Sequence, residues 1–585
     1  MAELGTTSPS MAAELLDALA RRTAHGLADR AASFVPRASF RATELVLPIP
    51  PLVRGNPELA AAMYRGQFTL AGQTVNVGNR MIFELGPQSP SFDAALYSFD
   101  WLKHLEACGS ELARIQGRAL LADWIRSGIF RTYPARDLAI SARRTIAWVR
   151  HAAFFLKGAD AGFSRMFFQS LNRQGTRLAR AITFAPASRG RLEAAIALAY
   201  MVTSLGGLEK MRSEILERLG DELSEQILPD GGHVSRNPAA TVELLLDLIP
   251  LRDTLHANKL ETPAAFDAAV ERMVPFLRLM LHGDGGIAVF NGVSDTLAGS
   301  ARAVIDADDV RGKPITLARH SGYARLAYGR STILVDVGRP PAPGLNPAAQ
   351  SGPLALEFSD GPHRIVVNCG TPPSADPAWM AASRLTVAHS TATVGGRSAS
   401  RIIDSNMGRL VFGAPAMFGP QTVDGELTVH ETGSVLEAYH NGYLSAFGCL
   451  HERRLFLARH GADFRGEDRF LATPEGNGLD TQATFDIRFH FHPSVRVVMT
   501  RGGQSVNLIL PNRVAWRFSA RGATMQVLDS VYLPGSPQPR RTHQIVLSGT
   551  LGQSTSVKWA FRRLDQPAAA PGAEAESGPS SALEY

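Results

Sequence analysis

The hydrophobic positions of the chain recur with two different periods. Between about residues 94 and 281, apolar side chains return at helical spacing, as in Leu192, Ile196 and Ala199. This spacing keeps one face of a helix apolar. Glycine and proline residues interrupt the pattern at intervals of an ordinary helix length, so we predict several helices joined by short loops. Such a series can bury its apolar faces only by stacking or by closing into a ring.

After about Arg319 the period changes from 3.6 to 2. Residues 485–492 alternate four apolar with four polar side chains, and shorter alternating runs follow turn-forming residues elsewhere. This alternation is typical of strands with one buried face. Many short strands over residues 316–565 predict a sandwich of two large sheets. His490 and His492 fall on the polar face of their run, which predicts that both are exposed to solvent.

The two periods divide the chain into parts. We expect an N-terminal extension at 1–90 with an amphipathic helix at 11–27, a helical domain at 91–315, a β-sandwich at 316–565 and a disordered tail at 566–585. The tail is rich in Ala, Pro, Gly, Ser and Glu, a composition that does not bury a core. The boundary between the helical and the all-β domain should fall within 301–319.

Composition narrows the class of protein. With 45% hydrophobic and 19% charged residues, the chain has the composition of a globular protein, and no apolar run is long enough to span a bilayer. The net charge of +6 depends on arginine, because only six of the 60 basic residues are lysines. These arginines are spread along the whole chain, which predicts solvated faces and no patch for nucleic acid.

The cysteines and the N-terminus add two exclusions. The three cysteines lie far apart without a CxxC spacing, so we expect neither a disulfide framework nor a cysteine metal site. The first residues lack the basic region of a secretory signal. The sequence by itself therefore predicts a cytoplasmic location.

Several segments resemble the heparinase II/III family of polysaccharide lyases. In chain order they are Leu96-Tyr97-Ser98-Phe99-Asp100-Trp101-Leu102, Gln226-Ile227-Leu228-Pro229-Asp230-Gly231-Gly232-His233, Leu354-Ala355-Leu356-Glu357-Phe358-Ser359-Asp360-Gly361, Ala388-His389-Ser390-Thr391, His440-Asn441-Gly442-Tyr443 and His451-Glu452-Arg453-Arg454. The resemblance implies an incomplete α/α toroid followed by a large antiparallel β-sandwich. It also implies β-elimination on an acidic, uronate-containing polysaccharide between the domains, and a periplasmic location as the alternative to the cytoplasm.

β-Elimination needs a group that neutralises the uronate carboxylate, a base for the C5 proton and an acid for the leaving oxygen. Where the family tends to carry Asn-His before a helix, this chain has Arg189-Gly190-Arg191-Leu192. Where the family supplies a tyrosine, it has Asn237-Pro238-Ala239-Ala240. The resemblance thus implies that the neutralising pair and the catalytic tyrosine are missing.

The zinc ligands of the family are also reduced. Counting along the resemblance, the ligand histidine is replaced by Gln350, the ligand aspartate by Asn368 and a catalytic histidine by Ala348, which leaves His389. Amides are poor zinc ligands beside imidazole and carboxylate. We therefore predict no cofactor and less than one equivalent of zinc.

Candidate catalytic residues remain around the turn at 230–237. His233 could serve as an acid or base beside a carboxylate clamp made by Arg236 and Asn237, and His389 is the second candidate for proton transfer. The same turn is also explained by helix punctuation, with Ser235 or Asn237 capping a helix that begins at Pro238. Both interpretations stay open and are compatible, because a capped helix start can itself bind an anion.

Candidate substrate-binding residues lie at the end of the helical half and in the sandwich. His282 and Asn291 belong to a glycine-rich segment that faces the cleft in the family, although turn formation alone would explain the glycines. Tyr323 and Tyr439 could contact sugar faces or simply pack in strands. Gln350 completes the set through its place in the resemblance.

Two functions are therefore open. The first is a polysaccharide lyase, a carbon–oxygen lyase if active, whose partner is an acidic polysaccharide. The second is a catalytically degenerate protein with the same fold that binds carbohydrate or handles an envelope polymer. Hydrolysis by paired carboxylates is disfavoured, because the helical half has no acidic pair in a comparable setting.

Overall fold

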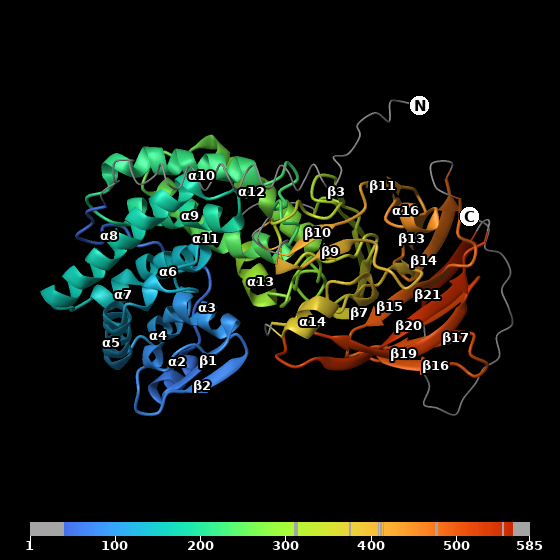
Figure 1. The fold of residues 1–585 in the computed structure, drawn as a ribbon, viewed down its shortest axis with the longest axis horizontal. Coiled ribbons are helices and arrows are strands. Elements are labelled where there is room, and N and C mark those ends of the chain that lie inside the picture. Colours follow the sequence, from blue (N-terminus) through green and yellow to red (C-terminus); the bar gives the residue numbers. More distant parts are fainter. Residues whose placement is uncertain are drawn as a thin grey trace.

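The computed structural model describes residues 40–308, 314–373, 376–406, 409, 412, 415–473, 478–552 and 555–564. The amphipathic helix expected at 11–27 and the tail expected at 566–585 lie outside this range. Figure 1 shows two halves side by side, helices in the blue and green part of the chain and strands in the yellow to red part. Among the described residues, no helix is both long and apolar enough to cross a membrane.

The helical half contains most of the helices of the described chain. Their bounds are α2 Pro57–Tyr64, α3 Pro90–Ser98, α4 Leu102–Cys108, α5 Glu111–Ser127, α6 Leu138–Arg150, α7 Ala152–Leu156, α8 Ala161–Phe184, α9 Arg189–Ser204, α10 Arg212–Gln226, α11 Pro238–Ala257, α12 Ala264–Met280 and α13 Ala298–Asp306, with the short 3₁₀ helices η2 Ile82–Glu84, η3 Ile129–Arg131 and η4 Glu209–Met211. Local sequence sets many of their starts. Ser110 and Asp160 cap α5 and α8 with side-chain oxygens, which satisfy backbone N–H groups that the first helical turn leaves free.

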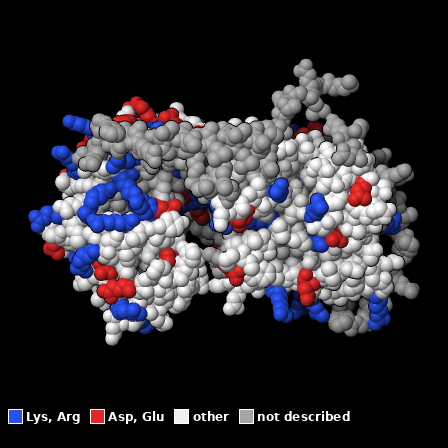
Figure 2. Space-filling view, in the orientation of Figure 1, with Lys and Arg blue, Asp and Glu red and all other residues white. Residues whose placement is uncertain are grey.

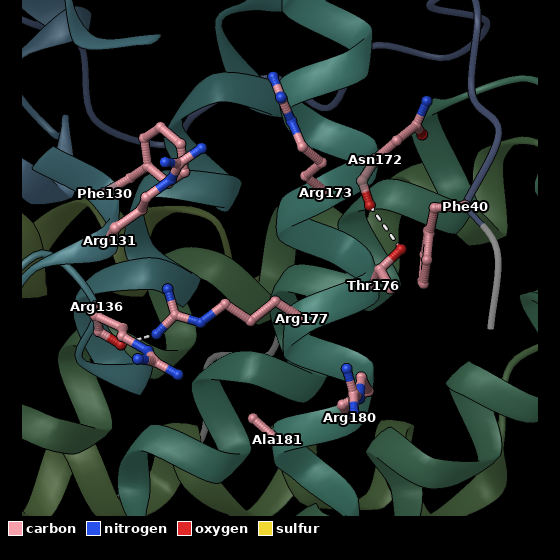
Figure 3. Close-up of a pocket in the computed structure, with 10 residues that line it drawn as sticks. All are labelled: Phe40, Phe130, Arg131, Arg136, Asn172, Arg173, Thr176, Arg177, Arg180 and Ala181. Atoms are coloured by element: carbon pink, nitrogen blue, oxygen red, sulfur yellow. Dashed lines mark hydrogen bonds between the residues drawn. The ribbon is translucent and has the colours of Figure 1, made fainter. Parts of the chain in front are cut away.

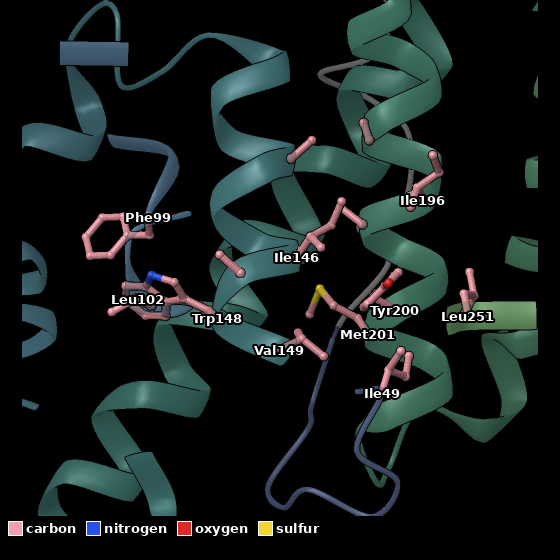
Figure 4. Close-up of a cluster of buried hydrophobic side chains, with 14 of the residues drawn as sticks. Ile49, Phe99, Leu102, Ile146, Trp148, Val149, Ile196, Tyr200, Met201 and Leu251 are labelled. Atoms are coloured by element: carbon pink, nitrogen blue, oxygen red, sulfur yellow. The ribbon is translucent and has the colours of Figure 1, made fainter. Parts of the chain in front are cut away.

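The core of the helical half surrounds α9, in which every residue from Leu192 to Ser204 is buried. Helices α6, α8, α10 and α11 pack against it, and Figure 4 shows side chains such as Ile146, Tyr200 and Met201 meeting between them. Residues 40–90 join this core, because Ile49 is buried in the same cluster. The hairpin of β1 Gln67–Leu70 and β2 Gln73–Asn76 also belongs to that segment. The described part of the expected extension is thus packed into the helical half.

The second half is a sandwich of two antiparallel sheets. The nine-stranded sheet has the order β19-β20-β15-β7-β6-β5-β4-β3 with β8 paired to β15, and the eight-stranded sheet has the order β11-β12-β13-β14-β21-β18-β17-β16. The strands of the first sheet are β3 Leu317–Ala318, β4 Tyr323–Tyr328, β5 Ser331–Asp336, β6 Leu356–Asp360, β7 His363–Val367, β8 Ala392–Val394, β15 Thr484–Phe491, β19 Thr524–Tyr532 and β20 Arg540–Thr550. Those of the second are β11 Val423–Val429, β12 Gly433–His440, β13 Cys449–Ala458, β14 Asp463–Ala472, β16 Arg496–Met499, β17 Ser505–Ile509, β18 Ala515–Arg521 and β21 Thr555–Leu564.

Smaller elements complete the sandwich half. They are the strand pair β9 Arg401–Ile403 and β10 Ala416–Phe418, the helices α14 Pro377–Ala382 and α16 Leu444–Phe447, and the 3₁₀ helix η5 Thr386–Ala388. Aromatic side chains fill the space between the two large sheets: the ring of Phe358 lies 5.0 Å from that of Trp516 and 5.7 Å from that of Phe561.

The change from helices to strands lies between α13 and β3. The last helix before the sandwich ends at Asp306 and the first strand begins at Leu317. Helix α12 and strand β4 then meet in a small hydrophobic cluster that includes Phe276, Met280 and Tyr323. This cluster joins the end of the helical half to the first strands of the sandwich.

One expectation about a strand face is wrong. His490 lies on the polar face of β15 but is buried, with its Nδ1 2.7 Å from Ser530 Oγ and its Nε2 3.0 Å from the Val387 carbonyl. His492, two residues on, is only half-buried. The period of 2 identifies a face of the strand, whereas whether another segment covers that face depends on the tertiary structure.

Candidate functional site

Arg236 forms the centre of a polar network between the two halves. It adopts a left-handed backbone conformation, with φ 55°, in the turn before α11. Its guanidinium group donates to Asp336 Oδ1 at 2.5 Å. Its other N–H groups donate to backbone carbonyls of the sandwich: Ser321 at 2.7 Å, Gly322 at 3.0 Å, Gly338 at 3.1 Å and Arg339 at 2.6 Å. Burial opposes the charge, but Asp336 raises the pKa of Arg236 above its usual value.

Tyr323 and Asn291 close the network on one side. The Tyr323 hydroxyl donates to the Arg236 carbonyl at 2.5 Å and accepts from Asn291 Nδ2 at 2.8 Å. The same amide lies 3.2 Å from Asp336 Oδ2, and the Arg236 guanidinium stacks 4.9 Å from the Tyr323 ring centre. Burial raises the pKa of Tyr323 well above its ordinary value, so the phenol keeps its proton.

The Gln350 side chain also forms hydrogen bonds at both ends of its amide. Its Oε1 accepts from the Gly292 N–H at 3.3 Å, while its Nε2 donates to Thr371 Oγ1 and to the Ser383 carbonyl, both at 3.1 Å. The side chain is almost fully buried. Both ends of the amide are therefore used within the protein.

His233 and Asn237 serve the ends of helices. His233 Nδ1 lies 2.7 Å from Ser235 Oγ, and its Nε2 lies 3.3 Å from Gln226 Oε1 at the end of α10. Burial, with a smaller effect of Arg189, lowers the pKa of His233 to about 3. Asn237 Oδ1 accepts from the Ala239 N–H at 2.9 Å, so of the two predicted caps, Ser235 and Asn237, it is Asn237 that caps α11.

His282 is paired with a glutamate inside the sandwich. Its Nε2 lies 2.9 Å from Glu357 Oε2, and its Nδ1 lies 2.8 Å from Ser359 Oγ. Arg364 approaches the same carboxylate at 3.6 Å. Burial and Arg364 lower the pKa of His282. Sequence reasoning quoted Glu357 only as part of a motif, although a carboxylate within an apolar strand is a signal of a buried partner.

His389 is the one candidate with a ring nitrogen that lacks a partner. Its Nδ1 lies 2.9 Å from the Leu385 carbonyl, while its Nε2 is buried and makes no hydrogen bond. Burial lowers the pKa of His389 to about 4. The Asn368 amide, at the expected position of a zinc ligand, instead donates to Glu357 Oε1 at 3.3 Å and accepts from the Ser390 N–H at 2.9 Å.

This donor set does not fit zinc. It offers one imidazole and two amides whose polar atoms already bind the protein, and amides are weak zinc ligands. Within the described residues, no group of three or more His, Cys, Asp and Glu side chains is placed to hold a metal ion. Elemental analysis of the purified protein tests the prediction that it contains less than one equivalent of zinc.

Tyr439 lies apart from the other candidates. It sits on β12 opposite Glu452, with 37% of its surface exposed. That strand belongs to the eight-stranded sheet, whereas Tyr323 and Asp336 lie in the nine-stranded sheet. The structure thus brings Arg236, Asn291, Tyr323 and Gln350 together and leaves Tyr439 outside.

A second network fills the place where the resemblance puts the neutralising pair. Arg189 Nε donates to Glu193 Oε1 at 2.9 Å and also bonds Glu243. Arg143 reaches the same Glu193 oxygen at 2.8 Å. Sequence reasoning missed Glu193 and Glu243, which lie 4 and 54 positions from Arg189. Each arginine is matched by a carboxylate of the protein itself.

Comparison with known proteins gives one family match and one curated relative. Residues 310–560 match the family model of the heparinase II/III-like C-terminal region. The chain is 31% identical over 522 residues to FtsZ-localized protein C of Caulobacter vibrioides (strain NA1000 / CB15N), and the match covers 86% of this chain and 87% of the relative.

Solved structures share the fold at low sequence identity. Heparinase III superposes with a TM-score of 0.67 at 13% identity, covering 94% of this chain and 92% of that one. A mutant of heparan sulfate lyase HepC from Pedobacter heparinus gives a TM-score of 0.58 at 13% identity, covering 94% and 89%. The helical half followed by antiparallel sheets is thus the fold of these lyases, with a helical toroid and a β-sandwich.

Proposed function

Because this chain belongs to the heparinase II/III-like family and most of its candidate polar groups between the two halves are hydrogen-bonded within the protein, we propose that it binds an acidic polysaccharide without cleaving it. The observation that carries this proposal is the saturation of Arg236, whose guanidinium N–H groups all donate to protein acceptors. Breaking a buried ion pair costs about 3–5 kcal/mol. Arg236 is therefore a poor group with which to neutralise a substrate carboxylate.

The candidate bases support the same proposal. A general base works best when its pKa lies near the working pH. The pKa of His233 is lowered to about 3 and that of His389 to about 4, in both cases chiefly by burial. Both imidazoles are then neutral but weak bases, and Tyr323 retains its proton because burial raises the pKa of its phenol.

The ligand class rests on the fold. One structure with the same fold is named as a heparan sulfate lyase, and an acidic polysaccharide is the ligand that this likeness suggests. Figure 2 shows the surface hollowed between the helical half and the sandwich, and an extended chain could lie there. Binding of the polysaccharide can be tested independently of the loss of catalysis.

The test is an elimination and binding assay on the purified protein. Heparan sulfate, alginate, hyaluronan and bacterial acidic polysaccharides are incubated with it, and the ultraviolet absorbance of unsaturated uronates is followed. We expect no product, and retention of at least one of these polymers in affinity electrophoresis. Product that disappears in His389→Ala would contradict the proposal and identify an active lyase, with His389 as the group that transfers the proton. Failure to retain any polymer would refute the binding function.

A second candidate function follows from the curated relative. That protein is named for localisation with FtsZ, and we propose that this chain also localises with FtsZ. A fluorescent fusion imaged together with FtsZ tests this, and a distribution unaffected by FtsZ depletion would contradict it. A compartment-specific reporter fusion decides between the cytoplasmic prediction and the periplasmic alternative.

A further inference from the structure

Five arginines surround a cavity on the helical half, away from the interdomain network. Figure 3 shows this cavity, which has a volume of about 940 Å³. The five are Arg131, Arg136, Arg173, Arg177 and Arg180. In Figure 2, Lys and Arg side chains form a ring around a hollow at the left of the molecule. The even spread of arginines along the sequence did not indicate this gathering, which depends on how separate segments pack.

The fold builds the cavity from two walls. Arg173, Arg177 and Arg180 lie on α8 at spacings of four and three residues, which places them on one face of the helix. Arg131 in η3 and Arg136 before α6 form the opposite wall. Arg177 reaches across and donates a hydrogen bond to the Arg136 carbonyl. The two walls therefore hold their guanidinium groups around one space.

Among the described residues, no carboxylate balances these charges at the cavity surface. None of the ten lining residues is acidic, and among the ion pairs of the described residues none includes one of the five arginines. Asp137 exerts some attraction on Arg177, but its carboxylate caps α6. Burial and the charge of Arg136 lower the pKa of Arg177. Like charges held together without a partner favour an anion.

Other arginines of the same half differ from these five. Arg143, Arg189 and Arg191 each form an ion pair with a glutamate. A high arginine content therefore does not by itself leave guanidinium groups unpaired. The missing counter-charge is a property of the cavity.

We propose that this cavity binds a discrete soluble ligand that carries at least two phosphate or sulfate groups. Guanidinium groups bind such groups through paired hydrogen bonds, and five of them exceed what one small anion can use. The volume lies within the range of about 300–1,000 Å³ that is usual for small-ligand sites. A concave site of this size fits a compact ligand better than it fits a flat anionic surface.

The aromatic ring of Phe130 narrows the range of ligands that would fit the cavity. It lines the cavity beneath the Arg131 guanidinium, 5.3 Å from its centre. A flat apolar ring beside cations suits a base or a sugar face attached to the charged groups. A nucleoside polyphosphate and a sulfated oligosaccharide share this chemistry. The proposal goes beyond polysaccharide binding between the domains, because its residues belong to a different part of the molecule.

Isothermal titration calorimetry with the full chain tests the proposal. Three soluble probes are used separately, sodium tripolyphosphate, ATP and a heparin tetrasaccharide, and vesicles containing phosphatidylglycerol are titrated in a further experiment. Two double variants each remove one wall, Arg173→Gln with Arg180→Gln and Arg131→Gln with Arg136→Gln; these four side chains are exposed, so the fold should be kept. The matched control is Arg496→Gln with Arg521→Gln, which removes two exposed arginines from β16 and β18 of the sandwich.

We expect at least one probe to bind the unmodified chain, and each wall variant to weaken that binding by about tenfold or more. The control should bind as the unmodified chain does. Tighter binding of ATP indicates a nucleotide source, and tighter binding of the tetrasaccharide indicates a carbohydrate source; either result supports the site. Binding that is absent for all three probes, or equal in the wall variants and the control, overturns the proposal. Binding only to vesicles containing phosphatidylglycerol also overturns it, in favour of a membrane surface. These outcomes do not depend on whether an acidic polysaccharide is cleaved.

Discussion

Two regions of this molecule use arginine side chains in opposite ways. Around Arg236, one buried guanidinium meets one carboxylate and four carbonyls, and its donors are all used. Around α8, five guanidinium groups share one cavity without an acidic lining residue. The first arrangement holds two halves of the protein together, whereas the second leaves charge available for a ligand. Partner and burial, more than residue type, therefore decide what an arginine does here.

The candidate residues between the two halves mainly make structural contacts. The turn at 230–237 has the residue types of a catalytic site, but its contacts hold the helical half against the sandwich. We call Arg236, Asp336 and the residues bonded to them the interdomain joint. His233 binds the end of α10 and Asn237 caps α11. A reacting group needs a free lone pair or proton facing the substrate. By contrast, the Arg236 guanidinium and both ring nitrogens of His233 are engaged with the protein, and His389 Nε2 is buried without a hydrogen bond.

The largest expected loss of stability follows from removing Arg236, the centre of the interdomain joint. Arg236→Ala should lower the free energy of unfolding by about 3–5 kcal/mol, because Asp336 is left buried without its cation. Arg173→Ala, on the exposed wall of the cavity, should change it by less than about 0.5 kcal/mol. Urea denaturation of the full chain measures both. Similar small losses in the two variants would show that the Arg236 network adds little to stability.

Anion binding at the arginine cavity should stabilise the folded chain. Ligand that binds only the folded chain stabilises it, by about 2.7 kcal/mol when its concentration is 100 times the dissociation constant. Tripolyphosphate should therefore stabilise the unmodified chain in urea denaturation. The effect should disappear in Arg173→Gln with Arg180→Gln and persist in Asn237→Ala, which leaves the cavity intact. A stabilisation that survives loss of the α8 arginines would place the anion elsewhere.

The pH dependence of stability tests how deeply the joint is buried. The folded-state pKa of His233 is lowered to about 3, whereas an unfolded histidine has a pKa of about 6.5. Between these values the unfolded chain binds one proton more, so stability falls as the pH falls, by up to about 1.4 kcal/mol per pH unit from this group. His233→Gln should reduce the slope of unfolding free energy against pH near pH 5 by about that amount. Asn237→Ala, which removes no titrating group, should leave the slope unchanged. An unchanged slope in His233→Gln would mean that His233 is protonated in the folded chain.

The smallest predicted effect concerns the helix cap. Asn237→Ala removes the side-chain acceptor of the Ala239 N–H and should lower the free energy of unfolding by about 1 kcal/mol. Asn237→Asp keeps an acceptor and should lose less. If Asn237 instead contacts a polysaccharide, the alanine variant will weaken polymer retention in affinity electrophoresis, and its role in the proposed function must be revised.

The sequence by itself determined the order of the two halves and much of the local structure. The period change placed the boundary between α13 and β3, and alternation identified strands such as β15. Asn237 followed by Pro238 marked the start of α11. These features are local, because the period and the cap depend on residues within one element or one turn.

Only the tertiary structure decided how the polar side chains are used. Arg236 and Asp336 are 100 positions apart, and the two walls of the arginine cavity come from separate segments. His490 lies on a polar face that another segment covers. A sequence pattern shows which face of an element is apolar, but the partner of a charge and the cover of a face depend on how distant elements pack. For that reason the fold followed from the sequence, whereas the difference between a joint and a binding cavity did not.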